Sequence, residues 1–416
     1  MKTTLIAISV HSAITITLYF LLNRYGVFTA VPNQQNLLNW DANWYFSILS
    51  NGYVFVPYET CNLAFFPMFP YFWKVLGVDP VYMSLVNITI FFGSLHFLLE
   101  KYKLPVLSIL ILLSVPSLLF MGLPYSEALF FVFSTMILKG YETNRPNLHR
   151  IGFFFVTMIR SVSLIFIPAI VITELLAGDP RETISARIKK ITPDVLCCLS
   201  GLMISSFTQY VQTGKWFYFL EVQKYWGRTW HIPHFPLTTF SPGRILELDA
   251  ISFCMGTLAL FFLMRKAFEF FSGAASGAAQ EWRKEAPLIF SCLYITGTTI
   301  LDVCFSQSYK EITSISSLNR HLLCTPFALI MIIYLIRDLE SRNYSVMFYA
   351  IIPLICFYLT GVFRYYTALF YVAFFANVAI MRYLPRLRLA PWLFYLISMA
   401  LQLYLYHDFL LFKWIG

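Results

Sequence analysis

Long apolar segments follow one another along this chain, and short clusters of lysine and arginine separate them. Only 12% of the residues are charged and 58% are hydrophobic, whereas soluble domains carry about 25% charged residues. Because so few polar groups cannot cover a surface that faces water, the chain must use lipid as its main solvent. A helix that crosses a bilayer needs about 20 apolar residues. The sequence therefore predicts an all-α polytopic membrane protein.

The basic clusters predict the direction of each crossing, because lysine and arginine mark cytoplasmic loops. The segments expected to cross singly are residues 4–23, 82–99, 104–121, 125–139, 192–211, 248–265, 286–304, 320–336, 346–362, 365–381 and 391–408. The first of them has no small-residue cleavage site and is interpreted as a retained span. Residues 1–416 are expected to form one integral membrane domain. Loops 24–80 and 213–246 are poor in basic residues for their length and are expected to be extracytoplasmic.

The apolar run at residues 151–176 departs from this alternation, because basic segments flank both of its ends. One helix crosses a bilayer once, so both ends of a single helix cannot lie in the cytoplasm. Arg160, Ser161 and Ser163 interrupt the run, and Pro168 follows. This pattern predicts two half-helices that meet at or below the outer face. Such a bend is tolerated only where protein or a wet cavity surrounds it.

The net charge of +9 does not indicate nucleic-acid binding, because the basic residues lie in short clusters between the apolar runs. Seven of the eight cysteines fall inside predicted spans and Cys61 lies in a loop, so neither a disulfide framework nor a CxxC metal site is expected. His231 and His234 stand three residues apart but have no cysteine or close carboxylate partner. No metal ion or other cofactor is expected.

One acidic residue stands among aromatics in "LLNWDANWYFSILSNGY", directly after the first apolar segment. Trp40, Trp44 and Ile48 recur at every fourth position and predict the apolar face of a short helix at the membrane interface. Asp41 and Tyr45 would project together from the neighbouring face. Asp41 has two interpretations, as a cap of this helix or as a functional acid.

Two ionisable residues interrupt later apolar segments. In "GLPYSEALF", Glu127 begins the span at 125–139, where the helix dipole favours a carboxylate. Alternatively, Tyr125, Ser126 and Glu127 line a cavity shared with the first loop. Ionisable residues within membranes are usually functional, so Arg160 is interpreted as a fixed cation for a phosphate oxygen or for Glu127. The alternative for Arg160 is a structural ion pair.

The second long loop mixes aromatic residues with cations in "GKWFYFLEVQKYWGRTWHIPHF". Lys224, Trp226 and Arg228 lie at its centre. A further pair, Arg320 and His321, heads a later predicted span. Aromatic faces bind sugar rings and cations bind phosphates, so these segments indicate an anionic, lipid-linked substrate.

Four motifs in this order resemble the PIG-V family, which adds the second mannose to glycosylphosphatidylinositol, together with its shorter prokaryotic homologues. They are "NWDANWYFSILSNGY" followed by "AFFPMFP", then "PYSEALFF", then "MIRSVSLIFIPAI". "FLEVQKYWGRTW" is similar to the shorter homologues. The family belongs to the GT-C glycosyltransferases, which implies about 11–13 transmembrane helices, a pair of half-helices and an outward-facing catalytic first loop.

The resemblance also implies a mannosyltransferase that uses a polyprenyl-phosphate donor. The family's Trp-Asp motif falls on Trp40 and Asp41, its Pro-Tyr-Ser-Glu motif ends at Glu127, and the arginine of its broken helix falls on Arg160. The Asn-Gly that usually follows that arginine is Val-Ser here. The family's C-terminal Arg-Tyr pattern falls on Arg320 and the histidine that follows it.

An inverting glycosyl transfer needs one base to take a proton from the acceptor hydroxyl, and Asp41 is predicted to be that base. A lipid phosphate leaves without protonation, and cations stabilise its charge. A glycosidase would need paired carboxylates instead. The residues predicted to bind substrate are Trp40, Tyr45, Tyr125, Glu127, Arg160, Lys224, Trp226, Arg320 and His321.

The expected partners are a polyprenyl-phosphate sugar donor, a lipid or glycan acceptor and membrane lipids, and a small membrane subunit is a further candidate. The expected location is a prokaryotic plasma membrane, with the endoplasmic reticulum membrane as the alternative. A rival function is a polytopic transporter or lipid flippase whose translocation site comprises Asp41, Glu127 and Arg160. An O-antigen-ligase-like transferase is a nearer rival, but it would rely on cations rather than on a Trp-Asp motif.

Overall fold

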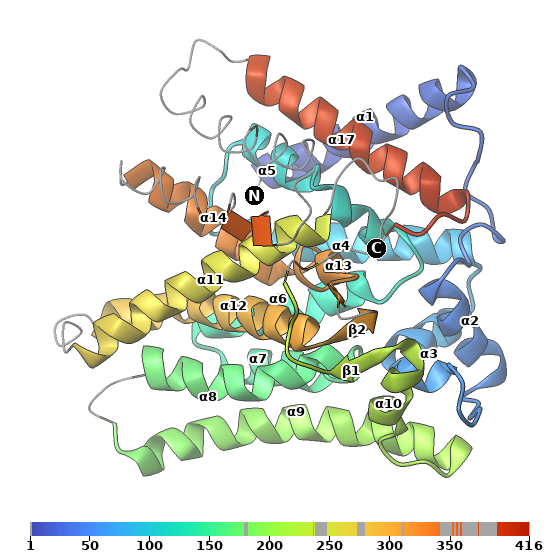
Figure 1. Ribbon diagram of the computed structural model, residues 1–416. Coiled ribbons are helices and arrows are strands. Elements are labelled where there is room, and N and C mark those ends of the chain that lie inside the picture. Colours follow the sequence, from blue (N-terminus) through green and yellow to red (C-terminus); the bar gives the residue numbers. More distant parts are fainter. Residues whose placement is uncertain are drawn as a thin grey trace.

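The computed structural model is mostly helical, with one small sheet (Figure 1). The structure describes residues 2–178, 182–235, 237, 248–272, 279–309, 312–341 and 389–415, together with residues 352, 355, 356, 358, 359 and 373. The described helices are α1 (Lys2–Arg24), α2 (Asp41–Asn51), α3 (Met68–Leu76), α4 (Pro80–Leu99), α5 (Val106–Leu113), α6 (Glu127–Thr143), α7 (Pro146–Val156), α8 (Phe166–Ala177), α9 (Ile184–Thr213), α10 (Tyr218–Glu221), α11 (Leu248–Phe271), α12 (Ala279–Cys304), α13 (Leu318–Leu322), α14 (Pro326–Ser341) and α17 (Leu389–Leu410). The 3₁₀ helices are η1 (Asn62–Ala64), η2 (Pro116–Gly122), η3 (Ser161–Ile165) and η4 (Val222–Trp226). The strands are β1 (Arg228–Trp230), β2 (Phe305–Tyr309) and β3 (Ile312–Ser314).

Six of the described helices are long and apolar enough to cross a membrane, which confirms the prediction of a multi-pass, all-α membrane protein. They are α1, α4, α9, α11, residues 284–304 of α12, and α17. A seventh span is present if η2 and α6, which are bent by 102° at their junction, count as one. The predicted spans at 346–362 and 365–381 lie almost entirely outside the described residues.

Residues 104–121, predicted to form one span, contain two short helices instead of a continuous one. The helix α5 has eight residues and ends before Pro116, which begins the 3₁₀ helix η2. A proline restricts the residue before it to extended conformations, and Val115 has a ψ of 120°. The segment predicted at 320–336 is also interrupted, because α13 ends at Leu322 and α14 begins at Pro326. This second break leaves Arg320 on a helix of only five residues.

The predicted break near Arg160 is confirmed. Helix α7 ends at Val156, Arg160 is extended with φ −149° and ψ 141°, and the chain resumes as η3 and α8. Helix α7 packs on α6 and α9, and α8 packs on α9 and α12, so both halves lie along α9 (Figure 1). A Cβ atom at Gly201 of α9 would collide with the carbonyl oxygen of Phe154 and the side chain of Thr157. A small residue at this position therefore lets α9 approach the end of α7.

A three-stranded antiparallel sheet is present where the sequence predicted only loops. Strand β1 pairs with β2, with Arg228 opposite Gln307 and Trp230 opposite Phe305, and β2 pairs with β3. Each strand has three to five residues, too few for an alternating pattern to stand out. The sheet ties the second long loop to the end of α12.

The two long loops pack against each other at one end of the helices, where α2, α3, α10 and β1 lie together (Figure 1). Ile48 of α2 shares a buried apolar cluster with Tyr218 and Val222 of the second loop. The ring of Trp44 meets the ring of Trp226 edge to face, with centroids 5.5 Å apart. At Trp44 and Ile48 the apolar face of α2 therefore packs on protein, and the contact brings the predicted site residues of the two loops together.

Candidate functional site

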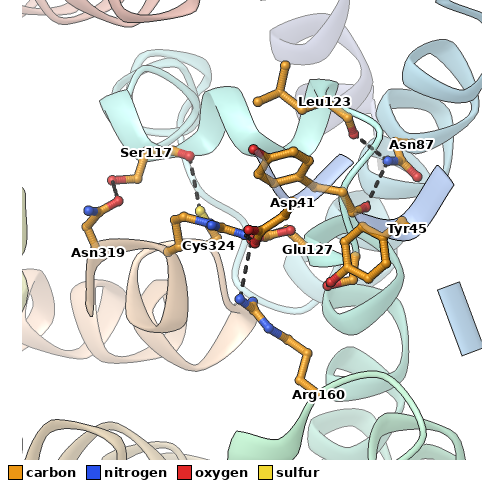
Figure 2. Close-up of polar contacts among 12 residues, drawn as sticks. Asp41, Tyr45, Asn87, Ser117, Leu123, Glu127, Arg160, Asn319 and Cys324 are labelled. Atoms are coloured by element: carbon orange, nitrogen blue, oxygen red, sulfur yellow. Dashed lines mark hydrogen bonds and ion pairs between the residues drawn. The ribbon is translucent and has the colours of Figure 1, made fainter. Parts of the chain in front are cut away.

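Four charged side chains from distant parts of the sequence converge at this end of the helices. Asp41 is the first residue of α2, Glu127 is the first residue of α6, Arg160 lies in the break before η3, and Arg320 lies in α13. Figure 2 shows Asp41, Glu127 and Arg160 pointing toward one another. In a chain with so few charges, this grouping is a candidate site.

Glu127 is fully buried beneath the other three side chains. Its Oε1 accepts hydrogen bonds from Nε and Nη2 of Arg320, at 2.9 and 2.7 Å, and lies 3.4 Å from Nη2 of Arg160. Its Oε2 has no hydrogen-bond partner among the described residues. A buried carboxylate needs such pairing, because an isolated ion in the interior is strongly destabilising. Glu127 thus holds two arginines in place.

Asp41 is the other partner of Arg320, whose Nη2 donates to Oδ2 at 2.7 Å. The cap position of α2 is occupied by Trp40, and no side chain forms a capping hydrogen bond there. The interpretation of Asp41 as the helix cap is therefore wrong, although its charge still suits the helix N-terminus. Trp40 has a φ of 54°, a conformation that residues other than glycine adopt at a cost and often at functional sites.

Arg320 is held on every side. Its guanidinium lies 4.9 Å from the ring centre of Phe120 and 4.7 Å from that of Tyr125, and only 3% of the residue is exposed. The preceding residue, Asn319, donates from its backbone and side-chain nitrogens to Asp249 Oδ1, at 2.8 and 2.7 Å. These contacts fix the side chain of Arg320, so Arg320 is better suited to positioning Asp41 than to moving toward a substrate.

Two tyrosines fix the surroundings of the acids. The Tyr45 hydroxyl donates to Ser126 Oγ at 2.9 Å, and the Tyr125 hydroxyl donates to the carbonyl oxygen of Asn39 at 3.2 Å. Burial, followed by the carboxylates of Asp41 and Glu127, raises the pKa of Tyr45 well above its ordinary value. Tyr45 therefore stays protonated and keeps its hydrogen bond to the residue that precedes α6.

A cavity of about 890 Å³ opens beside this cluster. The predicted site residues that line it are Asp41, Tyr45, Arg160, Lys224, Trp226, Arg320 and His321. The other three predicted residues are not among its lining residues. Tyr125 and Glu127 are buried, and Trp40 packs edge to face on Trp414, with ring centroids 5.0 Å apart.

The lining residues that were not assigned to the site from the sequence include Arg228, Asp302 and Trp414. The sequence did indicate that Asp302 could be functional, because it is an ionisable residue inside a predicted span. The sequence identified Arg228 only as one of several cations in the second loop. In the structure Arg228 lies in β1, and the pairing of β1 with β2 places it on the cavity wall. Trp414 follows the last span, and no sequence pattern linked it to Asp41.

The wall of the cavity is mainly apolar, and its described lysine and arginine residues besides Arg320 are Arg160, Lys224 and Arg228. Lys224 is half exposed and pairs with Glu221 at 3.0 Å. Among the residues that the structure describes, no group of three or more His, Cys, Asp or Glu side chains is arranged to hold a metal ion.

Comparison of the chain with protein-family models, with curated proteins and with solved structures gave no match. The chemistry of the cavity is thus the remaining guide to function. A partly exposed carboxylate can accept a proton, nearby cations can hold a phosphate, and aromatic rings can support a sugar.

Proposed function

We propose that this protein is an inverting glycosyltransferase that transfers a sugar from a polyprenyl-phosphate donor to a lipid-linked or glycan acceptor. The observation that carries the proposal is the carboxylate of Asp41, 21% exposed, on the wall of a cavity that Arg160, Lys224 and Arg228 also line. Its Oδ2 is bound by Arg320, whereas Oδ1 accepts no hydrogen bond from any residue in the described part of the chain. Oδ1 is therefore the atom assigned to the proton transfer.

In the proposed reaction the acceptor hydroxyl gives its proton to Asp41 Oδ1 as its oxygen attacks the anomeric carbon. The bond between that carbon and the phosphate oxygen breaks, and its electron pair leaves with the polyprenyl phosphate. Attack from the face opposite the leaving group inverts the anomeric configuration. No second acid is required, because the phosphate departs as a stable anion.

Arg160, Lys224 and Arg228 are the cations proposed to meet the donor phosphate. The closest carboxylate contact of Arg160 is 3.4 Å long, so its guanidinium retains donors for a ligand. The leaving phosphate gains charge in the transition state, and fixed cations are then most effective. Arg320 takes a different part, because its Nε and Nη2 are already bound to Asp41 and Glu127.

The GT-C fold and the PIG-V-like activity, with mannose as the sugar, belong to the same proposal. Two features support them beyond the motifs: Asp41 lies in the segment between the first two candidate spans, and Arg160 lies between two short helices. The proposal places the reaction on the extracytoplasmic face of a prokaryotic plasma membrane.

Purified protein in liposomes, supplied with labelled polyprenyl-phosphate sugars and a panel of lipid and glycan acceptors, tests the function. The expected result is a glycosylated acceptor of inverted anomeric configuration that depends on Asp41. Movement of the intact labelled lipid between leaflets, with no product, would instead support the transporter or flippase. A matched preparation of Asp41→Asn serves as the control in both measurements.

A further inference from the structure

A second carboxylate, Asp302, lines the same cavity from the last turn of α12. The residue is only 5% exposed, and its Oδ2 has no hydrogen-bond partner within the described ranges. Burying a polar group without a hydrogen bond is unfavourable, and burying a charge is more so. The position therefore suits a hydrogen-bond donor that arrives from outside the chain.

The neighbours of Asp302 do not supply that donor. Arg228 of β1 attracts its carboxylate and Asp249 of α11 repels it, but no hydrogen bond or ion pair joins Asp302 to either of them among the described residues. Asp249 Oδ1 already accepts two hydrogen bonds from Asn319. Thr298 lies one turn earlier on α12 and lines the same wall, as residues four apart on a helix do.

Asp302 and Asp41 line the same cavity but have different charged neighbours. The charges that act on Asp302 are those of Arg228 and Asp249, whereas Asp41 is bound to Arg320. In the proposed reaction the acceptor must lie next to Asp41, and the donor phosphate next to cations such as Arg228. A sugar attached to that phosphate would then be close to Asp302.

We infer that Asp302 binds a hydroxyl group of the transferred sugar. This inference rests on the proposed function and deepens it, because it names the group that selects the sugar. A sugar hydroxyl is a neutral donor that can satisfy a buried carboxylate with a charge-assisted hydrogen bond. Sites built to bind a hydroxyl discriminate strongly against analogues that lack it, because the polar group of the site is left unpaired.

The test compares wild-type protein with Asp302→Ala, using polyprenyl-phosphate mannose and its monodeoxy analogues as donors. For wild-type protein, one analogue should lower kcat/KM for the donor by about 10- to 100-fold, the range of a hydrogen bond to a charged group. Asp302→Ala should lower kcat/KM for the parent donor by a similar factor. The same analogue should then cause less than about a threefold further loss, because the two changes remove one interaction.

Thermal unfolding separates this role from a structural one. Removing a buried carboxylate whose Oδ2 has no described hydrogen-bond partner should leave the unfolding temperature unchanged or raise it. Asp302→Asn provides a second variant of nearly the same shape. Glu59→Ala, at an exposed position of the first loop, is the control for removing a carboxylate elsewhere and should change neither measurement.

Several outcomes would overturn the inference. In the first, wild-type protein and Asp302→Ala respond equally to every analogue. In the second, Asp302→Ala raises only the KM for the acceptor. In the third, both Asp302 variants lose much of their thermal stability. A loss of Mg²⁺ dependence in Asp302→Ala would assign the carboxylate to a cation instead.

Binding of the same donors, measured without an acceptor, separates the two proposals. If Asp302 determines which donor analogues bind but no sugar is transferred, the glycosyltransferase proposal is contradicted and the sugar-binding role of Asp302 is retained. If transfer is normal and Asp302 does not affect which analogues are used, only the sugar-binding role is contradicted.

Discussion

Arg320 and Asp41 are 279 positions apart in the sequence, and a 2.7 Å hydrogen bond joins Nη2 of the arginine to Oδ2 of the aspartate. The same nitrogen also donates to Glu127 Oε1 at 2.7 Å. Glu127 therefore fixes the arginine that fixes Asp41. One oxygen of Asp41 is restrained by this chain of contacts, and its direction relative to the cavity is set before any substrate binds.

Replacing Asp41 with asparagine should nearly abolish sugar transfer. The amide cannot accept a proton at ordinary pH, so the turnover number should fall by at least the roughly 10²- to 10⁴-fold typical of general base catalysis. Donor binding should be retained, because the cations assigned to the phosphate are other residues. Turnover and donor affinity, measured on the same purified preparation, check this prediction.

Glu59→Gln is a matched control, since it makes the same chemical change at an exposed position of the same loop. It should retain wild-type turnover. Near-normal turnover by Asp41→Asn would remove Asp41 from the reaction and leave it as a partner of Arg320 only.

Removing the guanidinium of Arg320 should destabilise the fold. Arg320→Ala leaves Glu127 buried and Asp41 partly buried without their main cation, and breaking such a pair costs about 3–5 kcal/mol. Arg320→Lys should retain part of the stability but lose activity, because one ammonium cannot reproduce the fork that binds both carboxylates. Thermal unfolding in detergent, together with the transfer assay, separates the two effects.

The double variant Arg320→Ala/Glu127→Gln tests the cause of that instability. Neutralising the buried carboxylate should restore much of the lost unfolding temperature without restoring turnover. If the double variant were no more stable than Arg320→Ala alone, lost packing against Phe120 and Tyr125 would be the reason instead of charge.

Tyr45 should matter more for its ring than for its hydroxyl. Tyr45→Phe removes one hydrogen bond to Ser126 and should lower stability by about 1 kcal/mol with a modest change in turnover. Tyr45→Ala removes a ring that packs on Phe65 and Phe69 and should cost about 3–5 kcal/mol. Equal loss of turnover in both variants, with stability retained, would show that the hydroxyl contacts substrate as the sequence predicted.

Much of the fold could be predicted because apolar length alone identifies helices such as α1, α4 and α17. The breaks before Pro116 and Pro326 were missed for a physical reason. Hydropathy averages over a whole segment, whereas a proline acts at one position by restricting the preceding residue and removing a backbone donor. The break at Arg160 was found because basic segments flank both ends of the apolar run, and Arg160 interrupts it.

The sequence identified most of the charged residues of the site but not the contacts between them. Scarce charges in an apolar chain must find partners, which singled out Asp41, Glu127, Arg160 and Arg320. Which of them pair depends on how α2, α6 and α13 pack, and no local pattern encodes that. Asp302 was missed because it lies in the last turn of α12, where the sequence alone does not distinguish a buried carboxylate from one at an exposed helix end.

The topology predicts opposite labelling of two exposed residues, Ser185 near the start of α9 and Thr229 beyond its end. The 30 residues of α9 extend about 45 Å at 1.5 Å per residue, enough to cross a bilayer. In a cysteine-free background, Thr229→Cys should react with an impermeant reagent in intact cells, and Ser185→Cys only after permeabilisation. Equal labelling of both from outside would contradict the extracytoplasmic placement of the second loop.

Gly201→Ala should disturb the support of Arg160. The new methyl group would meet the Phe154 carbonyl oxygen and the Thr157 side chain, pushing α9 away from the end of α7. We expect a loss of about 1–3 kcal/mol and reduced turnover. Gly93→Ala in α4 is the control, because its methyl group meets nothing within 4 Å and alanine favours a helix. A Gly201→Ala protein as stable as wild type would show that the interface accommodates the methyl group.

The small sheet also constrains how the cavity can open. The backbone pairing of Thr229 with Ser306 couples the wall that carries Arg228 to the strand that directly follows α12. If the cavity widens at this wall to admit a bulky acceptor, either this ladder breaks or β1, β2 and β3 move together. In the second case Arg228, the cation proposed to meet the leaving phosphate, would move with the strands, so admission of the acceptor and stabilisation of the departing group would be mechanically linked.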